Sequence, residues 1–199
     1  MSTPVYATPL HALTDDARVD RDAAMTAVAD LLLALGHDPD AGDLVETPRR
    51  VADALIEMLS PEPFEMTTFP NDDGYDEAVV VRGVPFVSLC RHHLLPFRGT
   101  ATIGYLPGDR LVGLSKLARV ALHHARGLQV QEAMTMQIAR TLETALTPRG
   151  VGVVVEAEHL CMSARGVRTA TATTVTTAFR GELAHDDALQ ARLIGARTS

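Results

Sequence analysis

Val84-Pro-Phe-Val-Ser-Leu-Cys90 and Gly99-Thr-Ala-Thr-Ile-Gly-Tyr-Leu106 are two runs in which the hydrophobic pattern moves towards a period of two. That period predicts extended strands, because the side chains of a strand alternate between the two faces of a sheet. Ala78-Val-Val-Val-Arg82 predicts that the extended chain begins further upstream. Pro107-Gly108-Asp109 predicts a turn after the second run. We therefore expect two consecutive strands at the centre of the chain.

The segments that follow predict two helices and then two further strands. Residues 115–126 and 130–146 are expected to be helical, with Gly127 between them, and the second helix carries apolar residues at every fourth position. Val151–His159 and Ala170–Phe179 are rich in β-branched residues and predict strands. This order predicts an α+β fold: a four-stranded, largely antiparallel sheet with two helices on one face. Its open edges and bare face favour association with other copies.

The chain before the sheet is expected to divide into an arm and a helical region. Residues 1–20 show no hydrophobic period, and we expect a mobile N-terminal arm there. Residues 21–75 are expected to form an N-terminal helical region, in which a second helix starts at Thr47-Pro48. Residues 76–199 then form the sheet domain, and a short helix over 187–194 ends it.

Composition narrows the classes of function. The chain has 199 residues and a hydrophobic fraction of 46%, which suits one core-bearing domain with an extension. We expect a cytoplasmic protein, since no run has the length and apolarity of a membrane span and the N-terminus lacks the pattern of a secretion signal. The net charge of -7 opposes binding to nucleic acid or to anionic membranes. This net charge is still compatible with binding of a small anion by a few positioned cationic side chains.

The two cysteines of the chain, Cys90 and Cys161, each have histidine within three residues. Thiolate and imidazole are preferred ligands of zinc, and catalytic zinc takes three protein ligands and leaves one position for water. A ligand set of Cys90, His93 and Cys161 would leave His92 and His159 beside the metal as acid–base candidates. Two alternatives remain open at this point: a closed structural site with four protein ligands, and a pair of inert buried cysteines.

Five motifs, in this order along residues 22–183, resemble GTP cyclohydrolase I: Glu46-Thr-Pro-Arg-Arg50-Val-Ala, Cys90-Arg-His-His93-Leu-Leu-Pro-Phe, Gly113-Leu-Ser-Lys-Leu-Ala-Arg119, Gln129-Val-Gln-Glu132 and His159-Leu-Cys-Met-Ser-Ala-Arg165-Gly-Val. The resemblance implies the tunnelling fold (T-fold) for the catalytic domain and a toroidal homo-oligomer, a decamer in well-known members, with sites at subunit interfaces. It implies conversion of GTP to 7,8-dihydroneopterin triphosphate with release of formate, the first step of tetrahydrofolate and pterin biosynthesis.

The resemblance also implies a role for each matching residue. The zinc ligands would be Cys90, His93 and Cys161, and the metal would activate a water for attack on C8 of guanine. His92 and His159 match proton-transfer groups, and Ser115 matches a residue of the later rearrangement. Residues that match the substrate-binding positions are Glu132 and Gln131 for the guanine, and Lys116, Arg119, Arg165 and Arg50 for the triphosphate. Arg50 is expected to act across a subunit boundary.

The chain departs from the family pattern at four positions. Arg91 stands where glutamate is common, Gly127 and Ala133 where arginine is common, and Asp53 where lysine often occurs. These changes affect charges near the predicted zinc ligands and the triphosphate. Two rival readings therefore stay open beside the cyclohydrolase: a specialised paralogue that gives an altered product from GTP or a related purine nucleotide, and a non-catalytic member that binds zinc or nucleotide.

Overall fold

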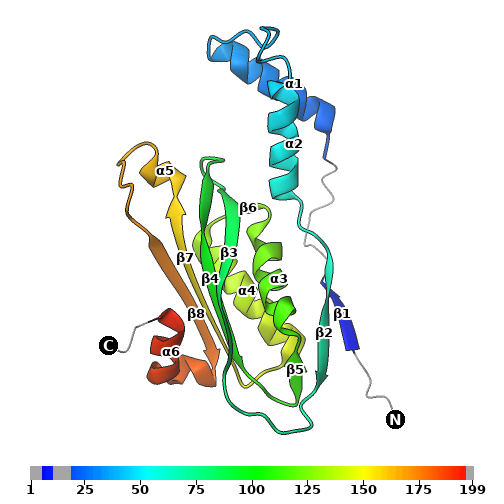
Figure 1. Ribbon diagram of the computed structural model, residues 1–199, viewed down its shortest axis with the longest axis vertical. Helices are drawn as coiled ribbons and strands as arrows, with labels where there is room; N and C mark the ends of the chain where they lie inside the picture. Colours follow the sequence, from blue (N-terminus) through cyan, green and yellow to red (C-terminus); the bar gives the residue numbers. More distant parts are fainter. Residues whose placement is uncertain (1–5, 11–18, 196–199) are drawn as a thin grey trace. The chain divides into compact units, whose positions relative to one another are not determined.

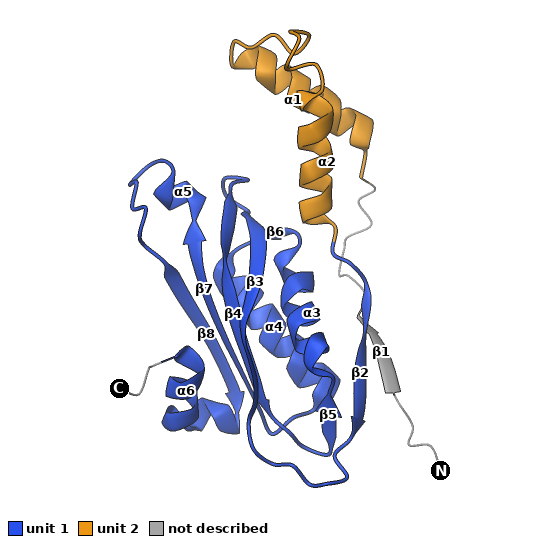
Figure 2. Ribbon diagram, viewed as in Figure 1, with its two compact units in different colours: residues 1–11, 61–199 blue, residues 12–60 orange. Residues whose placement is uncertain are grey.

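The computed structural model describes residues 6–10 and 19–195, and the chain divides into two compact units (Figures 1 and 2). One unit comprises residues 1–11 and 61–199 and contains all the strands; the other comprises residues 12–60. The division places residues 61–75 with the sheets, although the sequence had suggested a helical region up to residue 75. The expected mobile arm over residues 1–20 lies mostly outside the described residues.

The larger sheet has five strands in the order β6-β3-β4-β7-β8. Four of them are antiparallel neighbours and correspond to the expected strands: β3 (Val79–Cys90), β4 (Pro96–Leu106), β7 (Gly150–His159) and β8 (Thr174–Gly181). The fifth, β6 (Leu128–Gln129), pairs in parallel with the end of β3. The expectation of a four-stranded sheet therefore missed one short strand. Gly127 permits it, because its φ of 119° lies in a region that side chains disfavour and there turns the chain back towards Cys90.

Helices α3 (Leu114–Ala125) and α4 (Gln131–Leu146) cover one face of this sheet (Figure 1). The apolar stripe expected on the second helix is buried against the sheet, with Met134, Ile138, Leu142 and Leu146 at most 2% exposed. Ile103 and Val153 meet them from the sheet and are fully buried. Because α3 and α4 pack on this core, the core sets where each helix begins and ends relative to the strands.

A second, smaller core lies under the C-terminal helix α6 (Asp187–Ile194), which follows the one-turn helix η1 (Glu182–His185). Leu193 of α6 is buried with Leu106, Val154 and Leu183. It approaches the paired glycines Gly104 and Gly152, where an added Cβ would stand 3.0 and 2.9 Å from its Cδ2 atom. These two glycines therefore make room for Leu193, and α6 covers part of the sheet.

A three-stranded sheet in the order β1-β2-β5 was not predicted from the sequence. It consists of β1 (Tyr6–Leu10), β2 (Phe64–Pro70) and β5 (Arg110–Val112), all antiparallel. The backbone N–H of Val112 donates to the Tyr105 hydroxyl at 3.2 Å. That bond ties β5, and with it the start of α3, to the end of β4 that lies furthest from Cys90.

The smaller unit is a pair of helices, α1 (Arg21–Ala34) and α2 (Thr47–Leu59). The Asp20 carboxylate caps α1 by accepting from the Ala23 N–H at 2.9 Å. Arg21 donates from two nitrogens to the Asp53 carboxylate, at 2.6 and 2.9 Å, and Arg49 donates to it at 3.1 Å. Asp53, one of the four departures from the family pattern, thus joins α1 to α2 by paired charges.

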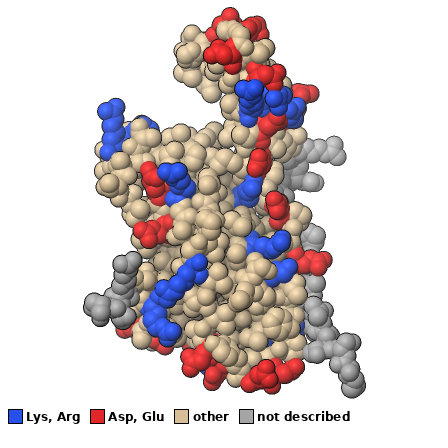
Figure 3. Space-filling model, in the orientation of Figure 1, with Lys and Arg blue, Asp and Glu red and all other residues tan. Residues whose placement is uncertain are grey.

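Acidic and basic side chains are interspersed over the face drawn in Figure 3, without a large area of one sign. Within the described residues, no helix has the length and apolarity needed to cross a membrane.

Gly99 of β4 is the point of closest approach between β4 and β7. A Cβ built there would overlap the carbonyl oxygen of Glu156 and come within 2.6 Å of the Ala157 Cα. Because backbone atoms cannot move aside cheaply, we expect Gly99→Ala to destabilise folding by about 3 kcal/mol or more, beyond the usual cost of overpacking. Urea unfolding would measure it. Gly42→Ala, with no atom within 4 Å of the added methyl, is the control; equal stability of the two variants would contradict the expectation.

Candidate metal centre

Cys90 ends β3, and the tight turn after it brings His93 back towards its sulfur. The turn is closed by backbone bonds from Cys90 N to Leu95 O and from Leu94 N to Cys90 O, both 2.9 Å long. Leu94 has a φ of 53°, a left-handed conformation that reverses the chain. As a result, the Sγ atom of Cys90 lies 3.7 Å from Nδ1 of His93.

Cys161 reaches the same place from the end of strand β7. Strand β7 pairs with β4 so that His159 lies opposite Phe97, and the chain then enters the one-turn helix α5 (Leu160–Ser163). The Cys90 and Cys161 sulfurs and one His93 ring nitrogen all lie within 4.8 Å of one another. Two sulfurs and an imidazole nitrogen at this spacing suit a single metal ion, so the two halves of the sequence converge on a group that can hold one.

The surroundings of Cys161 raise the pKa of its thiol and so favour the protonated form. Burial raises the pKa of Cys161, the neighbouring Cys90 thiol raises it further, and Arg165 opposes both effects. A bound divalent cation would reverse this balance, because a coordinating thiol gives up its proton. Cys90 and Cys161 are both free thiols, and with the His93 ring nitrogen they form a donor set that fits a metal.

His92 and His159 lie beside these three residues and outside the group. His92 is exposed, and its Nδ1 atom is 4.0 Å from the Cys90 sulfur. His159 is half-buried, and its ring stacks on Phe97 with a centroid separation of 4.7 Å. Burial lowers the pKa of His159, while the nearby Glu132 carboxylate raises it. Phe97 could not be singled out from the sequence, because the pairing of β4 with β7 is needed to place it under His159.

Glu132 and Arg165 belong to the same end of the sheet. Glu132 is exposed in the first turn of α4, which begins next to β6. Arg165 is exposed just after α5 and acts on the Cys161 thiol through its charge. Gln131, by contrast, is 2% exposed, and its side chain faces His159. These residues and the metal group form one cluster within a single chain.

Ser115, Lys116 and Arg119 lie elsewhere in the same chain. They sit on the first half of α3, whose start is held at the Tyr105 end of the sheet, while the end of α3 leads to β6 beside Cys90. The helix has 12 residues, a length of about 18 Å at the usual rise per residue. Ser115 is therefore roughly the length of this helix from the metal group. The structure does not bring the two sets of predicted site residues together within one copy.

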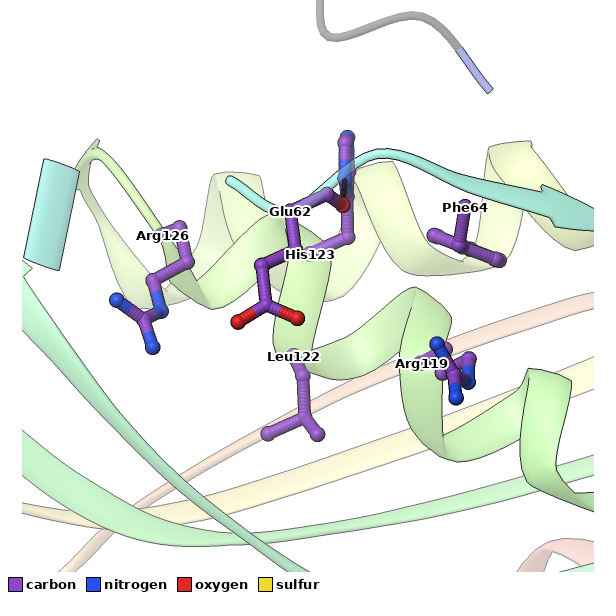
Figure 4. A pocket seen from close by; sticks show the side chains of 6 residues that line it. All are labelled: Glu62, Phe64, Arg119, Leu122, His123 and Arg126. Atoms are coloured by element: carbon purple, nitrogen blue, oxygen red, sulfur yellow. Dashed lines mark hydrogen bonds between the residues drawn. The ribbon is translucent and has the colours of Figure 1, made fainter. Parts of the chain in front are cut away.

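Arg119 instead lines a separate cavity of about 330 Å³ over α3 (Figure 4). His123 follows it on α3 and Arg126 comes directly after that helix, while Glu62, two residues before β2, and Phe64, the first residue of β2, also line the cavity. His123 donates from Nδ1 to the Glu62 carbonyl at 3.2 Å and meets the Phe64 ring edge-on. It is 8% exposed, so it serves packing.

Three more positions remain to be placed: the predicted substrate-binding residue Arg50, and Arg91 and Ala133, where the chain departs from the family pattern. Arg50 is exposed on α2, in the smaller unit. Arg91 donates from Nε and Nη2 to the Leu128 carbonyl at 3.4 and 3.3 Å, so its charge is directed to β6. Ala133 lies half-buried on α4, and nothing in its surroundings explains the absence of arginine there.

Comparison with known proteins places this chain in one family. A family model described as GTP cyclohydrolase I matches residues 24–197. The chain is 50% identical to "GTP cyclohydrolase 1" of Streptomyces griseus over 82% of this chain and 84% of that protein. It is 48% identical to the protein of that name from Mycobacteroides abscessus (88% of each chain) and 45% identical to that from Allorhizobium ampelinum (90% and 92%). The chain belongs to the GTP cyclohydrolase I family, which confirms the resemblance drawn from its motifs.

Proposed function

We propose that this protein catalyses the zinc-dependent conversion of GTP to 7,8-dihydroneopterin triphosphate and formate, the first step of tetrahydrofolate and pterin biosynthesis. Family membership makes the chain a hydrolase of the GTP cyclohydrolase type. The observation that carries the proposal is the group of Cys90, His93 and Cys161, whose ligand atoms lie within 4.8 Å of one another.

The donor set favours zinc over other divalent ions. Two thiolates and one imidazole are the ligands that zinc prefers, and three protein ligands leave a fourth position for solvent. Among the described residues, no other histidine, cysteine or carboxylate joins these three to make a larger group. This favours a catalytic site over a closed structural site. Zinc held there would supply an activated water molecule as the nucleophile.

The residues around the metal group then have the positions that proton transfer needs. Opening the imidazole ring of guanine and releasing its C8 carbon as formate requires repeated delivery of protons. His92 lies 4.0 Å from the Cys90 sulfur through Nδ1, and His159 is a titratable group two residues before Cys161. We assign them to these transfers. Half-burial of His159 favours its neutral form, which can accept a proton before passing it on.

Guanine is proposed to bind at the start of α4. A carboxylate can accept from both N1–H and the exocyclic amine of guanine, and Glu132 is an exposed carboxylate beside His159. Its exposure on the first turn leaves it free to do so, since within the described residues no salt bridge joins it to a cation. Arg165, from the same copy of the chain as Glu132, would bind the triphosphate.

The other proposed substrate contacts require a second copy of the chain. Ser115, Lys116 and Arg119 lie on the first half of α3, away from the metal group of their own chain, so they would complete the site of a neighbouring copy. A homo-oligomer with sites at its subunit interfaces satisfies this requirement, and the toroidal decamer of well-known relatives is the form we propose. Arg50 would likewise act across a subunit boundary.

The proposal is tested by identifying the products of GTP and measuring metal on the same sample. We expect close to one zinc per chain, stoichiometric formate, and a dihydropterin triphosphate that fluoresces after oxidation. A ring-opened product without formate would favour the specialised paralogue. Bound zinc in an ordered oligomer with no turnover at saturating GTP would favour the non-catalytic reading. Either result would overturn the proposed reaction.

A further inference from the structure

We infer that Gln131 is a positioning residue that fixes His159 in the tautomer with its proton on Nε2, and that its side chain does not bind the guanine. The inference rests on the proposed function, because it assigns a task to His159 in that reaction. It differs from the role that the family resemblance suggested for Gln131, which was contact with the substrate.

The side-chain amide of Gln131 is held in one orientation. Its Nε2 atom lies 3.0 Å from the Val155 carbonyl, 2.9 Å from the Thr174 carbonyl and 3.1 Å from the Thr176 hydroxyl. Carbonyl oxygens only accept, so the NH₂ group must face them. At 2% exposure the side chain has no water to substitute for these partners. Turning the amide over would bring its oxygen against two carbonyl oxygens and leave buried groups unsatisfied.

Two threonines complete the anchor. The Thr135 hydroxyl donates to the backbone carbonyl of Gln131 at 2.8 Å and lies 2.7 Å from the Thr176 hydroxyl. Because the Thr135 proton is already used, Thr176 donates to Thr135 and keeps its lone pairs for the Gln131 amide. The chain of bonds joins α4 to β8, so the amide is fixed by two elements of the core.

The fixed amide leaves only its oxygen for His159. Oε1 of Gln131 lies 2.7 Å from Nε2 of His159. Since Oε1 can only accept, Nε2 of the imidazole must carry a hydrogen and donate it. The ring plane is set independently by Phe97, which is fully buried and stacks within 2° of parallel. The plane of the His159 ring and its rotation within that plane are thus both determined. Nδ1 of His159 is left as the nitrogen that can exchange a proton with a substrate.

Gln131→Met tests this role, because methionine has a similar length and cannot accept the imidazole proton. We expect kcat for formate release to fall about 10- to 100-fold, by analogy with the loss of a partner that orients a metal-bound imidazole, while KM for GTP changes less than about twofold. Gln131→Glu should not restore kcat, since a carboxylate would face the two carbonyl oxygens. Gln129→Met is the matched control: this glutamine is 7% exposed and its amide donates to the His124 carbonyl and to Gln137.

A spectroscopic measurement separates this inference from the proposed function. In the metal-loaded protein with ¹⁵N-labelled histidine, the His159 resonance should show the Nε2-protonated tautomer, and Gln131→Met should shift it towards a mixture while Gln129→Met leaves it unchanged. This measurement needs no turnover, so it stands even if GTP gives no formate. The inference is overturned if wild-type His159 carries its proton on Nδ1, or if Gln131→Met raises KM alone and leaves kcat intact, as loss of a guanine contact would.

Discussion

Replacing Cys161 with serine is expected to remove both the bound metal and the release of formate from GTP. Serine keeps the size of the side chain but offers a neutral hydroxyl, a poor ligand for zinc compared with a thiolate. The group would fall from three ligands to two. Loss of a residue that merely orients a ligand costs 10- to 100-fold, so loss of the ligand itself should lower formate release by more than about 100-fold.

His92→Ala is the informative comparison. His92 lies 4.0 Å from the Cys90 sulfur, yet it is outside the group whose ligand atoms converge. We expect this variant to keep its metal and to lose most of its turnover, because only a proton-transfer group has been removed. Metal analysis after gel filtration and a formate assay measure both quantities. If Cys161→Ser retained zinc and full activity, the ligand assignment would be wrong.

The sequence predicted the main elements of the fold because their patterns are local. The four-residue spacing on α4 and the β-branched runs of β7 and β8 each depend only on neighbouring residues, and α6 was predicted with the bounds 187–194 that the structure shows. Strand β2 was missed because Phe64–Pro70 follows a proline-rich turn and pairs with residues distant in the sequence. Strand β6 was missed because a strand of two residues is too short to show an alternation of apolar and polar side chains.

The metal group was predictable for a different reason. Cysteine and histidine at short spacing mark ligand chemistry even when the fold is unknown, so Cys90, His93 and Cys161 could be chosen before their convergence was seen. The role of Gln131 could not be found in this way. Its neighbour Glu132 suggested that both face the guanine, whereas adjacent positions on a helix point about 100° apart. The Gln131 side chain is the buried one of the two, and it donates to carbonyl groups of β7 and β8.

The motif resemblance implied sites at subunit interfaces, but the sequence could not say which residues cross from one copy to the next. The separation of Ser115, Lys116 and Arg119 from the metal group indicates three of them. The course of α3 from the Tyr105 end of β4 to β6 shows that one copy of the chain contributes these residues to a different place from its own cysteines. If the proposed reaction uses both sets, every working site contains parts of two chains.

Two inactive variants should therefore restore activity when they are assembled together. Cys161→Ser would lack the metal group, and a double variant with Lys116→Ala and Arg119→Ala would lack the proposed triphosphate contacts of α3. In oligomers assembled from equal amounts of both, random assortment gives about a quarter of the sites an intact metal group from one copy and intact cations from another. We expect formate release near a quarter of the wild-type rate. Pairing Cys161→Ser with Cys90→Ser is the control, since no site then has all three ligands. Absence of recovery in the first pair, with mixed oligomers verified by mass, would mean that each site is built from one chain and that α3 contributes nothing to its neighbour.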